Sequence, residues 1–201
     1  MANTSRINGL RPVKHLNGSP FNGQSNLYFV AAAADEILVG DSVKLTGSSD
    51  IYGNPAADLA TTEVPVGVVI GIMQSKFDPS GKLTTGSVSL DLPAEAQIAA
   101  TAAGYIMVAD SPDVVMEVEA GNGTPTVAST GFNASVTNGA RTSTTVTSPL
   151  ILDVATFSTT STLNFRVLGF SQKVGNEVGA AAKMLVMFNR HQLNAVGTTG
   201  I

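Results

Sequence analysis

Residues 64–73 read VPVGVVIGIM. Every even-numbered position in this stretch is β-branched, whereas the odd-numbered positions are mostly small residues or proline. Successive side chains of a strand point to opposite faces, so this alternation predicts a β-strand whose even face fills a core. Small residues on the other face would let another part of the protein approach the backbone closely. The apolar run is far shorter than the ~20 residues that a membrane-spanning helix needs.

The composition of the 201-residue chain extends the same preference. Gly, Thr, Ser and Val are abundant while strong helix formers are scarce, so we expect a mainly β protein. The length is sufficient to bury a substantial core. Only 13% of the residues are charged against 43% that are hydrophobic, which predicts that a partner covers part of the surface.

Strand patterns recur along the chain. Apolar or alternating runs predict strands over residues 27–34, 37–39, 42–46, 87–90, 165–171 and 183–189. The two C-terminal strands are apolar on both faces, which fits central strands of a barrel or sandwich, or strands covered by a neighbouring subunit. Residues 47–62 are rich in turn-forming residues and predict a surface loop. Residues 121–164 hold eighteen Ser and Thr, but apolar residues at strand-like spacing predict exposed β-hairpins there.

One short helix is expected at most, from Pro93 to Ala103, because an Ala-rich body follows a proline and precedes Gly104. The segments 105–110 and 113–120 predict a hairpin around an intervening Ser-Pro turn. Alternation in the second of these strands points its apolar residues inward and its acidic residues outward.

Residues 1–26 are expected to form an extended N-terminal arm. Pro12 and Pro20 favour extended conformations in the residues before them, and three Asn-Gly pairs favour turns with positive φ. The arm also holds three of the eleven Lys and Arg residues, which we expect to contact an acidic partner surface: Arg6, Arg11 and Lys14. We expect residues 6–20 to be ordered mainly by contact with another chain. The expected remainder is a single β-rich domain and a loose tail, over residues 27–194 and 195–201.

The charge and residue content argue against several classes of protein. A net charge of −4 disfavours general nucleic-acid binding, which requires a basic face. Without cysteine the chain has no disulfide, thiolate nucleophile or cysteine-based zinc site. The start lacks an apolar signal core, which predicts a soluble product made in the cytoplasm and no membrane partner. Asp50, Asp110 and Asp113 could supply oxygen ligands, but no calcium-loop spacing is present, so no metal site is predicted.

Candidate catalytic groups are few. Only His15 and His191 could serve as the base of a serine-hydrolase triad, and no Gly-x-Ser-x-Gly motif is present. Glu117 and Glu119 are spaced to share one strand face, which would suit a hydrolase with paired carboxylates. The same spacing is common in acidic stripes that face water or another subunit, and we favour that interpretation. We therefore predict no catalytic residue, no bound cofactor and no enzymatic activity.

Both ends of the chain resemble one group of proteins. Residues 6–18, RINGLRPVKHLNG, followed by YFV at 28–30, are similar to the start of small virion proteins of tailed bacteriophages encoded beside the major capsid protein. The end is similar to the same group, from LGF at 168–170 through VGA at 178–180 to VMFNRHQ at 186–192. The middle, with VGDSV at 39–43 and VGVV at 66–69, resembles head decoration, or cement, proteins more generally.

This resemblance implies a barrel or jelly-roll-like sandwich that binds the outer surface of the phage capsid and stabilises it by bridging capsomers. The implied partners are the major capsid protein and further copies of the chain, with a trimer favoured over a dimer. The implied location is the exterior of the virion, after synthesis in the host cytoplasm. The residues expected at the capsid or subunit interface are Arg6, Arg11, Pro12, Lys14, His15, Tyr28 and Phe29.

A second hypothesis places the chain in another class. A virion-surface or tail-fibre binding module could use the Thr-rich hairpins of residues 121–164 to contact a host glycan or receptor. The chain has no Trp and only three Tyr, which weakens this alternative because aromatic faces usually form sugar-binding platforms.

Overall fold

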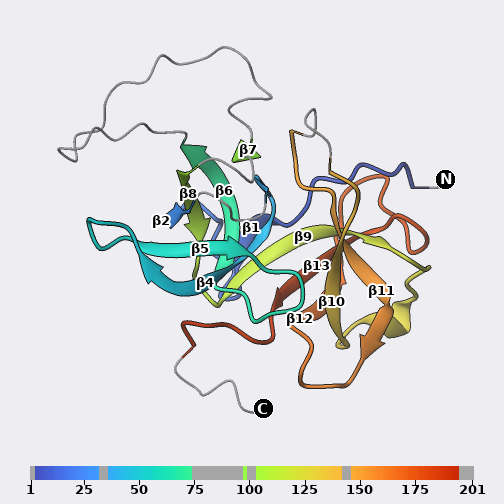
Figure 1. The fold of residues 1–201 in the computed structure, drawn as a ribbon. Coiled ribbons are helices and arrows are strands. Elements are labelled where there is room, and N and C mark those ends of the chain that lie inside the picture. The colour runs from blue at the N-terminus through green and yellow to red at the C-terminus, as the bar shows by residue number, and fades with distance from the viewer. Residues whose placement is uncertain (1–2, 32–35, 74–96, 99–102, 142–145, 195–201) are drawn as a thin grey trace.

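The computed structural model of the chain describes residues 3–31, 36–73, 97–98, 103–141 and 146–194. Within these ranges the chain is mainly β, with one 3-10 helix, η1 (Val127–Ser129), and no α-helix. The strands are β1 (Arg11–His15), β2 (Asn26–Val30), β3 (Ile37–Leu38), β4 (Ser42–Ser49), β5 (Pro55–Leu59), β6 (Gly67–Met73), β7 (Gln97–Ile98), β8 (Gly104–Ala109), β9 (Val114–Gly121), β10 (Asn133–Asn138), β11 (Leu150–Ser158), β12 (Phe165–Phe170) and β13 (Lys183–Phe188). The predicted fold class is confirmed (Figure 1).

Five strands close into a barrel in the order β2-β5-β4-β6-β8 (Figure 1). Its neighbouring strands are antiparallel except β2 and β5, which run parallel with Phe29 opposite Ala56. Closure removes the free sheet edges that would otherwise pair with other chains. The barrel core consists of Tyr28, Val30, Ile37, Val43, Ala57, Val66, Val69, Ile106 and Val108.

A six-stranded sheet forms the second half of the molecule, in the order β1-β9-β11-β10-β12-β13. Strand β13 also pairs with β9, so five of these strands form a closed circuit and β1 is an additional neighbour of β9. The rings of Phe165 and Phe188 lie 5.6 Å apart in its core. Other members of this core are Leu10, Val68, Val114, Met116, Val118, Leu150, Leu152, Val167, Met184 and Val186.

The strands predicted for the C-terminal half are present, but the expected exposure of the hairpins in residues 121–164 is wrong, because Val136, Leu150 and Leu152 are buried in the core of this sheet. Strands β10 and β11 form an antiparallel hairpin within the Ser- and Thr-rich region, and β12 pairs antiparallel with β13. Strand β13 buries every second side chain and leaves the intervening ones half-buried. The predicted tail over residues 195–201 lies outside the described residues.

The predicted hairpin between β8 and β9 is wrong, although both strands exist. Strand β8 pairs with β2 and β6 in the barrel, whereas β9 pairs with β1, β13 and β11 in the six-stranded sheet. The Ser-Pro turn therefore connects the two halves of the molecule. Both edges of each strand are taken by partners from distant parts of the chain, and a local pattern does not encode such pairing.

The VPVGVVIGIM stretch contains β6, and its predicted close approach is confirmed at Gly67. A Cβ at Gly67 would lie 2.5 Å from Val108 Cγ1 and 2.6 Å from Ala109 O. The prediction of a single buried face is wrong, because both faces of this strand are covered by a hydrophobic core. Val68 packs in the core of the six-stranded sheet, while its neighbour Val69 packs in the barrel core. This strand thus joins the two cores.

Two further predictions need correction. Most of the predicted helix from Pro93 to Ala103 lies outside the described residues, but β7 within it pairs antiparallel with β3 and is not helical. Gly104, expected to follow the helix, is the first residue of strand β8. In the predicted loop over residues 47–62, β5 forms a strand against β4 and β2. Its sequence, PAADL, lacks the β-branched residues that indicate a strand, although Ala56 and Ala57 are buried.

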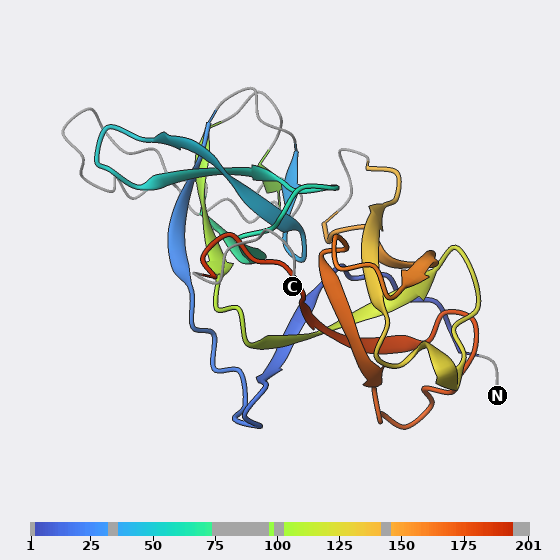
Figure 2. The same ribbon diagram turned by 90° about the horizontal axis from the view of Figure 1, so that it is seen from below.

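The N-terminal arm belongs to the fold of its own chain. Strand β1 pairs antiparallel with β9, and Leu10 just before it is only 1% exposed in the core of the six-stranded sheet. Figure 2 shows this segment running between the two halves before a turn leads back to β2. The extended conformation is confirmed for β1. The expectation that another chain orders residues 6–20 is wrong for this part of the arm, because its own chain supplies the contacts.

Candidate functional site

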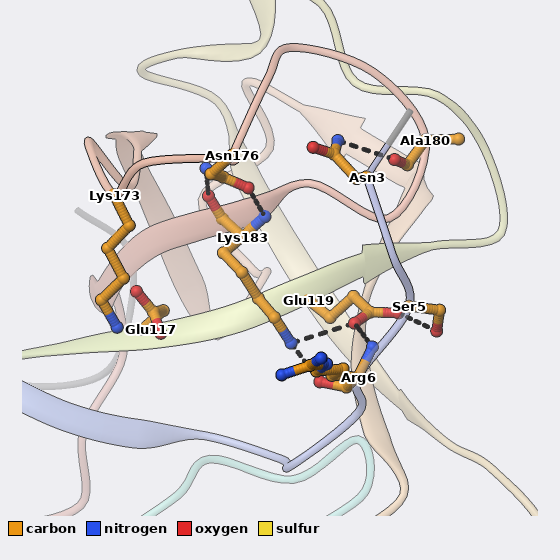
Figure 3. A network of polar contacts seen from close by, with 9 residues as sticks. All are labelled: Asn3, Ser5, Arg6, Glu117, Glu119, Lys173, Asn176, Ala180 and Lys183. Carbon is orange, nitrogen blue, oxygen red and sulfur yellow. Dashed lines mark hydrogen bonds and ion pairs between the residues drawn. The ribbon is translucent and has the colours of Figure 1, made fainter. Parts of the chain in front are cut away.

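The acidic residues of β9 lie at the centre of a polar network (Figure 3). Glu117 and Glu119 share one face of β9, as their spacing predicts, but they are only 8% and 4% exposed. The expectation that they face water is therefore wrong. Segments distant in sequence cover them, namely the N-terminal segment and the loop between β12 and β13.

Glu119 accepts hydrogen bonds from three donors. Ser5 Oγ lies 2.5 Å from Oε1, while the Arg6 backbone N and Lys183 Nζ lie 2.7 Å and 2.9 Å from Oε2. Lys183 is directly opposite Glu119 in the β9–β13 register, and its ammonium also donates to the Arg6 carbonyl. Two of the three donors to this buried carboxylate thus come from the N-terminal segment.

Glu117 is bound by a different segment, the loop that follows β12. Lys173 Nζ lies 2.7 Å from its Oε1, and Ser171 Oγ lies 2.6 Å from its Oε2. Both donors follow β12, so this carboxylate fixes the beginning of the loop that leads to β13. Lys173 is 58% exposed, whereas Lys183 is largely covered.

The environment keeps both carboxyl groups ionised. Burial raises the pKa of Glu117, but its lysine and serine donors and the lysine charge more than offset burial and bring the pKa below its ordinary value. Burial also raises the pKa of Glu119, and its three hydrogen-bond donors lower the pKa further than burial raises it. A general acid requires a raised pKa so that it holds its proton near neutral pH. These carboxylates are therefore suited to hold segments together.

Asn3 attaches the start of the described chain to the same loop. Its Nδ2 donates to the carbonyls of Glu177 and Ala180 at 2.8 Å and 2.9 Å, and its Oδ1 accepts from the Glu177 N at 2.8 Å. Asn176 holds the base of the loop by bonding the Lys183 backbone N and O at 2.7 Å and 2.9 Å. A hollow of about 490 Å³ lies between this loop and the N-terminal segment.

The predicted cations of the arm form an exposed edge. Arg6, Arg11 and Lys14 are exposed, and among the described residues their side chains make no ion pair. The first 34 residues contain three of the eleven Lys and Arg residues and none of the fifteen Asp and Glu residues. We call these three side chains the basic edge. Because the whole chain carries a net charge of −4, the basic edge is a local concentration of positive charge on an acidic protein.

The remaining predicted interface residues divide into two groups. Pro12 and His15 are half-buried on β1, and His15 Nδ1 lies 3.4 Å from Asp113 Oδ1. Tyr28 is buried in the barrel core with its hydroxyl 2.7 Å from Asp110 Oδ2, so its assignment to an exposed interface is wrong. Phe29 is half-buried and its ring centroid lies 5.5 Å from that of Tyr105.

Sequence reasoning missed the residues that complete the network. Ser5, Lys173 and Lys183 are ordinary polar residues in the sequence, and no motif connects them to β9. The one available signal was that buried strands rarely carry acidic residues unless these are paired. A second missed contact is the Arg141–Asp41 pair, in which Arg141 Nη1 lies 2.8 Å from the fully buried Asp41 carboxylate.

The comparisons with known proteins do not assign a family. No protein-family model, no curated protein and no solved structure matches the chain. Among the described residues, no helix is long and apolar enough to cross a membrane. In the same part of the chain, no group of three or more His, Asp or Glu residues is arranged to hold a metal ion.

Proposed function

We propose that this chain is a structural virion protein that binds the outer surface of a bacteriophage capsid and stabilises it by bridging capsomers. The observation that carries the proposal is the basic edge, which is presented by a segment that its own chain holds rigidly. Arg6, Arg11 and Lys14 face outward while Leu10 and the backbone of Arg6 are fixed inside.

Rigidity matters for a protein that must bind a large shell. An interface that is ordered before binding loses less conformational entropy when the partner arrives. Leu10 in the core, the β1–β9 pairing and the Glu119 hydrogen bonds order this segment in advance. The edge also coincides with residues 6–18, whose sequence resembles small phage virion proteins.

The charge distribution supports a protein partner with an acidic surface. Complementary charge accelerates association and selects the correct orientation. The rest of the chain is acidic, and the whole carries a net charge of −4, so repulsion would disfavour nucleic acid as the partner. The lowered pKa values of Glu117 and Glu119 fit structural ion pairs and differ from those that glycoside hydrolysis requires.

The test is binding to heads of the phage that encodes the chain, prepared without it. Deleting residues 2–20 would remove Leu10 and β1 and would confuse unfolding with lost docking. The double variant Arg11→Glu, Lys14→Glu reverses two charges on exposed side chains. Because residue 11 is opposite Glu117 in the β1–β9 register, urea unfolding checks that the variant remains folded. We expect the wild type to bind and raise the thermal stability of the heads, and the double variant to bind at least ~10-fold more weakly.

A control is the double variant Arg166→Glu, Arg190→Glu, which changes the net charge equally at one site in β12 and one site after β13. Both arginines donate side-chain hydrogen bonds, so urea unfolding checks that this variant remains folded. The control should bind heads almost as the wild type does. Equal losses in both double variants would show only a net-charge effect and contradict the role of the edge. If the wild type binds glycans on an array but does not bind heads, the receptor-binding alternative is favoured.

A further inference from the structure

A second hollow lies where the N-terminal segment meets both the barrel and the half that contains the six-stranded sheet. Leu10, Pro12 and Phe21 line it from the N-terminal segment, and Val39 and Ile70 line it from the barrel side. Arg11 and Thr147 also line this hollow, and both residues are exposed. The cavity volume is about 300 Å³, at the lower end of the range for sites that enclose small ligands. A hollow of this size suits one or two side chains of a partner.

The walls of this hollow are already fixed. The Leu10 N donates to the Gly40 carbonyl at 2.8 Å, and the Gly40 N donates to the Val69 carbonyl at 2.8 Å. Gly9 has a φ of +63°, and a Cβ there would lie 2.5 Å from the Gly40 oxygen, so only glycine allows this approach. The N-terminal segment, the β3–β4 turn and β6 thus form one continuous wall that needs no rearrangement to accept a side chain.

One cation stands in this lining without a local counterion. Arg11 is opposite Glu117 in the β1–β9 register, but the Glu117 carboxylate is already bound by Lys173 and Ser171. Among the described residues Arg11 makes no ion pair. An arginine at the margin of an apolar hollow is suited to a carboxylate on the occupant, because its guanidinium can donate two parallel hydrogen bonds.

We propose that this hollow is the anchor point for an extended acidic segment of the capsid partner. An apolar side chain of that segment enters the hollow, and a neighbouring carboxylate binds Arg11. Lys14, three residues further along β1, extends the same positive charge. A buried apolar anchor beside a charged contact is the arrangement in which a few residues supply most of the binding energy. The inference rests on the proposed function and names the site and partner chemistry for it.

The test fills the hollow without touching its fixed walls. Thr147→Trp introduces an indole from an exposed position in the lining, and Val146→Trp places the same ring at the adjacent exposed residue outside the lining. Two readouts are measured: binding to heads, and fluorescence of anilinonaphthalene sulfonate, a small probe with an apolar ring system and an anionic group. Urea unfolding checks that each variant remains folded.

We expect Thr147→Trp to weaken head binding on the order of 30-fold and to abolish probe binding, while Val146→Trp changes neither. Arg11→Gln should weaken both readouts and flatten the salt dependence of head binding. Wild-type head affinity in a folded Thr147→Trp that no longer binds the probe would overturn the inference and leave the proposed function intact. A wild type that binds no heads would overturn both, whatever the probe does.

Discussion

The carboxylates of β9 and the histidine that follows β13 are both buried, but their polar atoms are satisfied differently. Glu119 has three donors and Glu117 has two. His191 is 2% exposed, and its Nδ1 accepts from the Leu193 N at 3.1 Å. Its Nε2 has no hydrogen bond of good geometry among the described residues, although the Val66 backbone is near enough to affect the pKa of the ring. The β9 carboxylates hold the N-terminal segment, whereas His191 lies where the barrel meets the six-stranded sheet.

The His191 region is a joint between the two halves. The Gln192 N donates to the Pro65 carbonyl at 2.9 Å, and its Oε1 accepts from the Leu45 N at 2.7 Å. Asn164 Nδ2 donates to the carbonyls of Thr62 and Glu63, while its Oδ1 has no hydrogen-bond partner among the described residues. A buried polar atom without a partner costs free energy. The comparison therefore predicts a firmly held N-terminal segment and a more easily disturbed joint.

The largest effect is expected at Glu119. Glu119→Ala would leave the covered Lys183 ammonium without its carboxylate and remove the acceptor for Ser5 and the Arg6 N, which should cost ~3–5 kcal/mol of unfolding free energy. Urea unfolding measures this loss. Glu117→Ala is the matched comparison and should cost only ~1–2 kcal/mol, because Lys173 is 58% exposed and water can solvate it. A greater loss in Glu117→Ala would reverse the proposed ranking.

The two regions should also respond to acid in separate pH windows. Burial lowers the pKa of His191, and the Val66 carbonyl and Asp110 charge offset burial only in part. The unfolded chain therefore binds a proton at His191 first as the pH falls below 6.5, and stability declines from that point. The loss is about 1.4 kcal/mol for each pH unit by which the folded pKa is lowered.

The carboxylates follow at lower pH. The folded pKa values of Glu117 and Glu119 lie below the ordinary glutamate value of 4.5, so their contribution to stability is complete above that pH and is lost as the pH falls further. Unfolding free energies measured from pH 7.5 to 3.5 should show both phases. His191→Gln should remove the upper phase and retain the lower one. An unchanged upper phase in that variant would assign it to another group.

The smallest effect is expected at Asn3. Asn3→Ala removes the side chain that bonds Glu177 and Ala180, and it should cost ~1 kcal/mol and make the N-terminus more sensitive to limited proteolysis. Thr4→Ala, at the next exposed residue, is the control. Equal protease sensitivity in the two variants would mean that Asn3 does not anchor the segment.

Local pattern was enough to predict the strands but not their partners. Alternation placed Glu117 and Glu119 on one face of β9 correctly, because side-chain direction depends only on the neighbouring backbone. Their burial could not be predicted, because Lys173 and Lys183 lie 56 and 64 positions away along the chain. The same reason explains the hairpin expected between β8 and β9, which are adjacent in sequence but belong to different sheets.

In the candidate site, too, local sequence predicted some features, whereas others depend on contacts between distant segments. Composition identified the cations of the arm, and they are exposed as expected. Tyr28 follows the same stretch, but it alternates into the barrel core and binds Asp110. The two hollows depend on side chains brought together from several segments, so no single stretch of sequence predicts them.

The most direct test of the central claim is hydrogen exchange at the Arg6 amide in the isolated protein. This N–H donates to the buried Glu119 carboxylate at 2.7 Å, so its exchange reports whether the chain orders its own N-terminal segment. We predict strong protection in the wild type without any partner, and loss of that protection in Glu119→Ala at a pH and temperature where the variant stays folded. Free exchange at Arg6 in the isolated wild type, with protection only after heads are added, would contradict the account.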